Sequence, residues 1–103
     1  FGPVVAMIRA KDEADAIRIA NDSAYGLSAA VFTKDTARGL GVARQIHSGI
    51  CHVNGPTVHD EAQMPFGGVG ASGYGRFGGR QGIDSFTETR WITIETQPGH
   101  FPI

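Results

Sequence analysis

The feature that most constrains the fold is a 27-residue stretch, residues 54–80, with eight glycines, two prolines and no helical or strand periodicity. Irregular loops of this length are uncommon in compact domains, and those that occur are usually functional or held by a partner surface. The stretch separates an N-terminal part with alternating strand-like and helix-like segments from a short C-terminal part. We therefore expect a domain whose long glycine-rich loop packs closely against other surfaces.

The segments before this loop alternate between short apolar runs and amphipathic stretches. Buried strands are predicted at residues 4–8, 27–33 and 50–53, and helices are predicted between them. Asp12 and Asp35 stand where a helix N-cap is expected, and Gly49 stands where a left-handed C-cap would end the second helix. This order of elements predicts an α/β fold with parallel strands and crossover helices.

The C-terminal part is expected to contain a short helix and one strand. Residues 81–86 could form the helix, residues 87–96 alternate between apolar and polar side chains, and residues 97–103 form a loose tail. The strand at 87–96 has no predicted neighbour in this chain. Because a strand with unpaired edges invites pairing with another chain, we expect it to pair across a subunit or domain boundary.

Charge and cysteine content exclude several classes of protein. The chain has 103 residues, nine Lys and Arg against ten Asp and Glu, and a net charge of -1. This balance gives no electrostatic footprint for nucleic acid or for an anionic membrane. The single cysteine excludes an internal disulfide and a multi-thiolate zinc site, and it is typical of a reducing compartment. We expect a cytoplasmic protein that binds neither nucleic acid nor membrane.

The glycine-rich loop contains two overlapping G-x-G-x-x-G sequences, Gly68–Gly73 and Gly73–Gly78. A dinucleotide fingerprint needs a strand before the glycines and a long helix after them. Pro65 argues against a central strand here, so we interpret the glycines as sites of tight turns and close backbone approach. Two alternatives stay open: a self-contained binding module whose loop 67–79 holds a phosphate-bearing ligand, and a structural segment that exchanges its last strand.

Two sets of polar residues invite a catalytic or metal-binding interpretation. Cys51 is predicted to be a small buried apolar residue, because nothing in its sequence neighbourhood would activate a thiol. The residues His52, His59, Asp60 and Glu61 match no metal-ligand spacing, and we expect them to be solvated loop residues and no metal to be bound.

Several short motifs occur together in one order along the chain: Phe1–Val4, Ala24–Phe32, Pro65–Gly68 and Ser72–Arg76. From Phe1 to about Ile94 the chain resembles the C-terminal part of the NAD(P)-dependent aldehyde dehydrogenase superfamily. The stretch Asn54–Pro65 further resembles the branch that oxidises aromatic aldehydes, the salicylaldehyde, vanillin and benzaldehyde dehydrogenases. The chain also begins in apolar sequence, which fits a segment of a larger fold.

The resemblance implies a division of the chain and a reaction. Residues 1–86 would belong to the catalytic domain, residues 87–96 would be the oligomerisation strand, and residues 97–103 would be a tail. In the family a cysteine thiolate attacks the aldehyde, a hydride passes to NAD or NADP, and a glutamate activates the water that hydrolyses the thioester. Both catalytic residues are expected upstream of this chain. Cys51 does not match the nucleophile motif, so the chain alone is expected to be inactive.

The resemblance also implies roles for particular positions. Phe1 would pack beside the nicotinamide, and Val58 and His59 would lie on the loop that lines the substrate tunnel. Phe66 would form part of the same wall, where its ring could stack on an aromatic substrate. Residues 87–95 would join subunits into a dimer or tetramer. Gly70 is a departure, since many family members carry Lys there.

Overall fold

The computed structural model describes residues 2–100. Phe1, the residue expected beside the nicotinamide, lies outside the described residues. The elements in chain order are α1 (Glu13–Asn21), β1 (Tyr25–Gly26), β2 (Ser28–Val31), α2 (Thr36–Ala43), β3 (Ile50–Val53), β4 (Val69–Gly70) and α3 (Gly79–Asp84).

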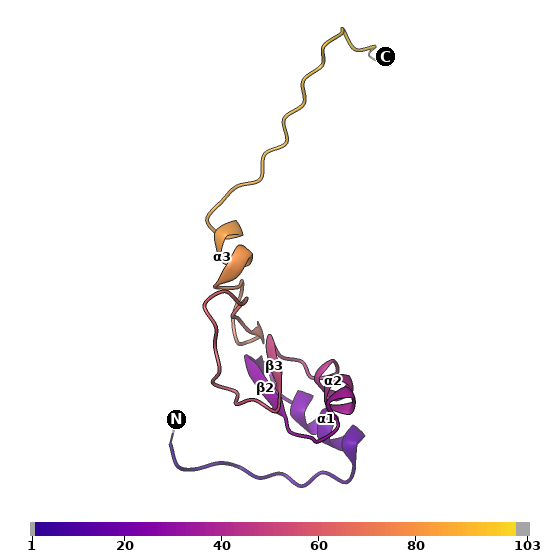
Figure 1. Cartoon of the computed structure of the whole chain (residues 1–103), viewed down its shortest axis with the longest axis vertical. Coiled ribbons are helices and arrows are strands. Elements are labelled where there is room, and N and C mark those ends of the chain that lie inside the picture. Colours follow the sequence, from indigo (N-terminus) through magenta and orange to yellow (C-terminus); the bar gives the residue numbers. More distant parts are fainter. Residues whose placement is uncertain (1, 101–103) are drawn as a thin grey trace.

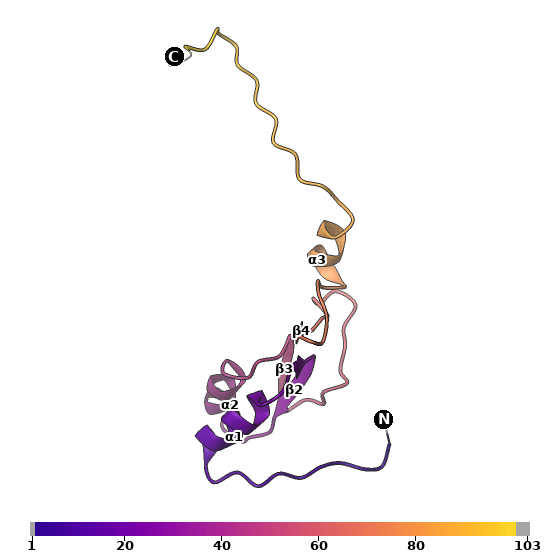
Figure 2. The same ribbon diagram turned by 180° about the vertical axis from the view of Figure 1, so that it is seen from behind.

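The centre of the fold is a β2–α2–β3 unit. The two strands pair in parallel, with Ser28 opposite Ile50 and Val31 opposite Val53. Helix α2 connects them and contacts both. Figures 1 and 2 show α1 and α2 side by side next to this two-stranded sheet. The chain therefore belongs to the α/β class.

Both helices begin at the predicted caps. The Asp12 carboxylate accepts a hydrogen bond from the backbone N–H of Asp15 at 2.8 Å, and the Asp35 carboxylate accepts one from Arg38 at 3.0 Å. The predicted end of the second helix is wrong. Helix α2 ends at Ala43, and Gly49 adopts no left-handed conformation because its N–H donates to the Gly26 carbonyl at 3.0 Å as the chain enters β3.

The glycine-rich loop carries regular structure of its own. Strand β4 pairs antiparallel with β1, with Tyr25 opposite Gly70. Further along, Phe66 and Phe77 form an isolated antiparallel bridge with backbone N–H···O distances of 2.8 and 2.7 Å. These pairings fold the loop back on itself and hold it beside the β2–β3 sheet.

The predicted strand at residues 4–8 is absent. The segment has no regular structure, and the side chains of Val4 and Met7 are 90% and 93% exposed. Figure 1 shows this indigo segment running apart from the sheet. A strand forms only against a partner that satisfies its backbone groups, and residues 2–100 supply no partner for this one.

Residues 87–96 extend away from the body of the chain, as Figure 2 shows. Among the described residues no strand pairs with them. Their extension raises the radius of gyration to 21.0 Å, against about 13 Å for a compact domain of this length. The pairing across subunits stays a prediction.

Burial is confined to glycines. In the described part of the chain the buried residues are Gly26, Gly39, Gly67 and Gly68, and no apolar side chain is buried. The accessible surface is 9177 Å², whereas a compact monomer of this mass exposes about 5,600 Å². The apolar side chains therefore need surfaces beyond these residues to cover them. Among residues 2–100 no helix is both long and apolar enough to cross a membrane.

Candidate functional site

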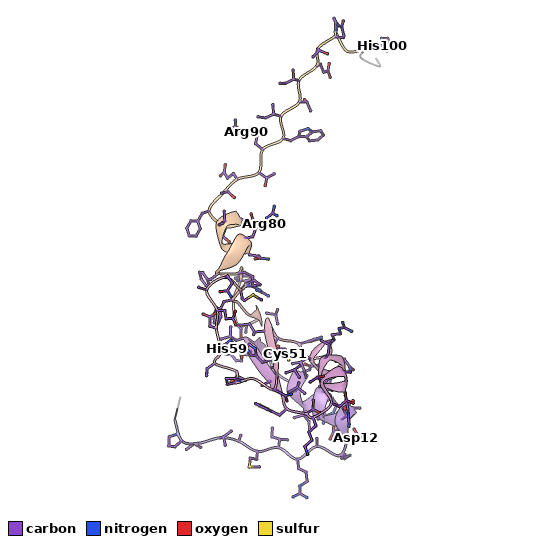
Figure 3. All side chains as sticks on the ribbon, viewed as in Figure 1. Asp12, Cys51, His59, Arg80, Arg90 and His100 are labelled. Carbon is purple, nitrogen blue, oxygen red and sulfur yellow. The ribbon has the colours of Figure 1, made fainter. Side chains whose placement is uncertain are left out.

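A cavity of about 400 Å³ lies between strand β3 and the loop that follows it. One wall is formed by residues around the start of β3 and the other by loop residues: Gly49, Ile50, Cys51, His52, His59, Asp60, Glu61, Met64, Pro65 and Phe66. Figure 3 labels Cys51 on the strand and His59 on the loop. Its volume is in the range of small-molecule sites.

The turn after β3 brings the loop back over the strand. Asn54 has a φ of 61°, in the left-handed region, so the chain changes direction directly after Val53. The Asn54 side chain fixes this turn by accepting a hydrogen bond from the Thr33 backbone N–H at 2.8 Å. A second bond, from the Ser28 hydroxyl to the Thr57 carbonyl, holds the loop against β2. These two bonds anchor the start of the loop to β2 and to the segment that follows it.

Two histidines meet in this cavity. The rings of His52 and His59 lie edge to face, with centroids 5.6 Å apart and planes at 84°. His59 Nε2 lies 3.2 Å from a carboxylate oxygen of Glu61, and the other oxygen accepts from the Gln63 amide. His52 Nε2 is enclosed and has no hydrogen-bond partner among residues 2–100. Nε2 of His59 therefore has a carboxylate partner, whereas Nε2 of His52 has none in the described part of the chain.

Cys51 is half-buried rather than fully buried as predicted, and it lines the same cavity. Burial raises the pKa of its thiol, which favours the unreactive protonated form. The thiol therefore has the character of a packing group rather than a nucleophile. In the described range no group of three or more His, Cys, Asp and Glu side chains is placed to hold a metal ion.

The predicted tunnel residues divide into two groups. His59 and Phe66 both line the cavity, although they come from opposite ends of its loop wall. Val58 is 71% exposed and is not part of the lining. His52 was predicted to be a solvated loop residue, and its place in the cavity wall was not foreseen. One feature of the sequence could have indicated its burial. His52 lies within the apolar segment Ile50–Val53, and every second side chain of such a strand is expected to be buried.

The glycines around Phe66 allow the backbone to approach other groups closely. A Cβ atom on Gly67 would lie 2.5 Å from the Gly75 carbonyl oxygen and 2.9 Å from Cδ of Arg76. The Arg76 guanidinium donates to the carbonyls of Gly68 and Gly75 at 2.9 and 2.7 Å. This network fixes the backbone that carries Phe66, in agreement with the predicted role of the glycines.

Neither G-x-G-x-x-G sequence has the surroundings of a dinucleotide site. The first overlaps the two-residue strand β4 and leads into a turn. The second leads into α3, which has six residues. A dinucleotide-binding βαβ unit needs about 30 residues with a long helix. The binding-module alternative is therefore not favoured.

Comparison with known proteins agrees with the motif order. Residues 1–92 match the aldehyde dehydrogenase family, and the chain belongs to that family. It is 57% identical over 103 residues to a vanillin dehydrogenase of Pseudomonas fluorescens, covering 100% of this chain and 21% of that protein. The chain spans about one fifth of the length of the curated relatives it matches.

Solved structures give the same result. The crystal structure of a salicylaldehyde dehydrogenase from Pseudomonas putida G7 complexed with salicylaldehyde superposes with a TM-score of 0.93 at 54% identity, covering 100% of this chain and 21% of that one. The Mycobacterium tuberculosis aldehyde dehydrogenase complexed with NAD+ superposes with a TM-score of 0.79 at 42% identity, covering 84% and 18%.

Proposed function

We propose that this chain is one segment of an NAD(P)-dependent dehydrogenase that oxidises aromatic aldehydes to carboxylic acids. The observation that carries the proposal is the agreement over the whole chain, at 54% identity and a TM-score of 0.93, with a salicylaldehyde dehydrogenase complexed with salicylaldehyde. The 57% identity with a vanillin dehydrogenase points to the same class of substrate, a substituted benzaldehyde.

The cavity beside β3 is the proposed end of the substrate tunnel. Its size suits one aromatic ring, and Phe66 offers an aromatic face at its wall. His59 forms the opposite part of the loop wall, where its bond to Glu61 fixes the ring. Val58 is assigned to the outer part of the same loop, where its exposed side chain is available to surfaces outside residues 2–100.

The reactive groups are proposed to lie in other segments of the polypeptide. The protonated state favoured for Cys51 argues against a nucleophilic role for this thiol, so another cysteine and a glutamate would attack the aldehyde and activate water. NAD or NADP supplies the hydride acceptor, as the NAD+ complex of a relative suggests. Phe1 is proposed to contact the nicotinamide and to help orient hydride transfer.

Assembly is proposed to involve residues 87–95. In this segment Trp91, Ile92 and Ile94 are all exposed, and the backbone is unpaired among the described residues. Addition to the edge of a partner's sheet would satisfy its backbone groups and cover these side chains.

The test is a substrate panel on the complete enzyme. We expect kcat/KM for benzaldehyde to exceed that for hexanal by at least about tenfold, the factor that corresponds to roughly 1.4 kcal/mol of differential binding. Reduction of NAD+ and of NADP+ should be followed in parallel. Failure to oxidise any aromatic aldehyde would overturn the proposal, and so would turnover by the 103-residue chain alone.

A further inference from the structure

The two asparagines of the chain, Asn21 and Asn54, have different surroundings. The side-chain amide of Asn21 is held at both ends. Its Nδ2 donates to the Gln45 carbonyl at 2.8 Å, and its Oδ1 accepts from the His47 N–H at 2.7 Å. The backbone N–H of the next residue, Asp22, donates to a carbonyl of helix α1 at 3.2 Å. Both the side chain of Asn21 and the backbone nitrogen that follows it are therefore fixed by hydrogen bonds.

Asn54 is exposed, and its side chain is held through one atom. Its Oδ1 accepts from the Thr33 N–H at 2.8 Å, whereas its NH2 group donates to no other group among residues 2–100. The backbone N–H of Gly55, the next residue, is likewise without an acceptor in the described part of the chain. Asn54 thus combines an unbonded amide NH2 group with an unbonded backbone nitrogen one residue further on.

These two groups are the leaving group and the nucleophile of asparagine deamidation. The backbone nitrogen of the following residue loses its proton to water and forms a bond to the side-chain carbonyl carbon. The bond from that carbon to Nδ2 breaks, and Nδ2 takes up a proton and leaves as ammonia. Water then adds to either carbonyl of the resulting cyclic imide, and the ring opens to give aspartate or isoaspartate. The reaction consumes one water, releases one ammonia and involves no oxidant.

The surroundings of Asn54 favour this reaction in two ways. Gly55 has no Cβ, so the backbone that carries the attacking nitrogen can turn toward the side chain with little steric resistance. Negative charge develops on Oδ1 as the nitrogen attacks, and the Thr33 N–H is already bonded to that oxygen. A donor placed where such charge develops stabilises the transition state, as in an oxyanion hole.

We propose that Asn54 is a site of spontaneous deamidation in the folded enzyme, through a cyclic imide formed with the backbone nitrogen of Gly55, and that Asn21 is protected from the same reaction. The modification would act at the turn after β3. Aspartate keeps an oxygen for the Thr33 N–H, whereas isoaspartate inserts a methylene group into the backbone where the chain turns back toward the cavity. Deamidation would therefore alter the loop wall of the cavity as the enzyme ages.

The test follows both asparagines in the complete enzyme. Trypsin places them on separate peptides, 19–34 and 45–76. After incubation of the folded enzyme at pH 8, we expect mass spectrometry to find both aspartate and isoaspartate at position 54 and unmodified asparagine at position 21. A sample digested without incubation corrects for deamidation during the digest.

Gly55→Ala is the matched variant. Gly55 has no positive φ, and a Cβ atom on it would lie 3.3 Å from Cβ of His52, so alanine requires only a small shift of its neighbour. Because a side chain at this position restricts the backbone turn that attack requires, deamidation of Asn54 should slow by about fivefold or more.

Several outcomes would overturn the inference. Aspartate without isoaspartate in the wild-type enzyme would indicate direct hydrolysis, and this result does not depend on the folding of any variant. An unchanged rate in folded Gly55→Ala would exclude attack by the Gly55 nitrogen. Intact Asn54 in the folded enzyme, with deamidation of the same peptide after denaturation, would show that the fold protects this residue. Equal deamidation of Asn21 and Asn54 would remove the role of the hydrogen bonds. None of these measurements uses aldehyde oxidation, so this inference and the proposed function can fail separately.

Discussion

Gly39 and Val53 bring helix α2 into direct contact with strand β3. Gly39 is buried, and a Cβ atom on it would lie 2.8 Å from Cγ1 of Val53 and 2.8 Å from Cγ2 of Thr33. Gly41, in the same helix, has no atom within 4 Å of its corresponding position. The two glycines thus have the same helical backbone and different surroundings.

This difference predicts opposite effects of one substitution. Gly39→Ala gains about 1 kcal/mol of helix propensity but forces two side-chain methyls apart, at a cost of about 1–3 kcal/mol. We expect a net loss of stability. Gly41→Ala gains the propensity alone and should stabilise by about 0.5–1 kcal/mol. Thermal unfolding of both variants of the complete enzyme gives the comparison, and a higher Tm for Gly39→Ala than for Gly41→Ala would contradict the packing described.

The turn at Asn54 predicts a graded series. Asn54 combines a left-handed φ of 61° with a hydrogen bond to the Thr33 N–H. Asn54→Ala loses both advantages and should destabilise by about 2–3 kcal/mol. Asn54→Gly restores the backbone freedom and should lose only about 1 kcal/mol, while Asn54→Asp keeps the acceptor. A Tm for the Gly variant below that of the Ala variant would show that backbone strain does not matter here.

The helices could be predicted from the sequence because their determinants are local. Asp12 and Asp35 each bond a backbone N–H three residues on, so the cap and its partner are adjacent in the sequence. The pairing of β1 with β4 joins Gly26 to Val69, and the glycine-rich sequence around Val69 has no alternation that would indicate a strand. The apolar residues 4–8 matched a strand pattern, but a strand also requires a neighbour, which residues 2–100 do not provide.

The candidate site was predictable only in part. His59 and Phe66 were chosen from the family resemblance, and the structure brings both to one cavity. His52 was overlooked because its enclosure depends on the loop that returns over β3 after the Asn54 turn. No spacing in the sequence shows that return. Val58 lies on the same loop but is not among the residues that line the cavity.

Cys51 should be slow to alkylate. Burial raises the pKa of its thiol, so less thiolate is present at neutral pH than for a free cysteine. We expect iodoacetamide to modify the Cys51 peptide of the folded enzyme more slowly than the same peptide after denaturation, as measured by mass spectrometry at pH 8. The Cys51 thiol of the unfolded chain loses its proton near its ordinary pKa of 9.0, whereas the thiol of the folded chain loses its proton at a higher pH. The free energy of unfolding should therefore decrease as the pH rises above 9.0.

The variant Cys51→Ala tests whether the Cys51 thiol is the catalytic nucleophile. Cys51→Ala removes the sulfur but leaves β3 and its pairing with Ala29. We expect the variant to retain a kcat within about tenfold of the wild-type value, whereas loss of a true nucleophile costs many orders of magnitude. Complete loss of activity in a folded Cys51→Ala enzyme would assign the reaction to this residue.

Phe66 and Phe77 pair with each other in one backbone bridge, and together they test whether Phe66 forms part of the substrate tunnel. Phe66 lines the cavity, whereas Phe77 is 72% exposed and lies outside the lining. Phe66→Leu should raise KM for benzaldehyde about 2- to 12-fold, the loss expected for one aromatic pair, and should change KM for hexanal much less. Phe77→Leu is the control and should change neither value. Equal effects of the two substitutions on KM for benzaldehyde would remove Phe66 from the substrate site.

The exposed segment at residues 87–95 should govern assembly. A proline at Ile92 removes a backbone N–H donor and cannot occupy the interior of a paired strand, so Ile92→Pro should shift the complete enzyme toward smaller species in light scattering coupled to size exclusion. Gln97→Pro is the control, because it lies beyond the proposed strand and next to Pro98. If pairing carries the assembly, Ile92→Ala should weaken it less than Ile92→Pro, since the backbone bonds survive while side-chain burial is reduced. An oligomer that stays intact in Ile92→Pro at submicromolar concentration would place the subunit contact elsewhere in the enzyme.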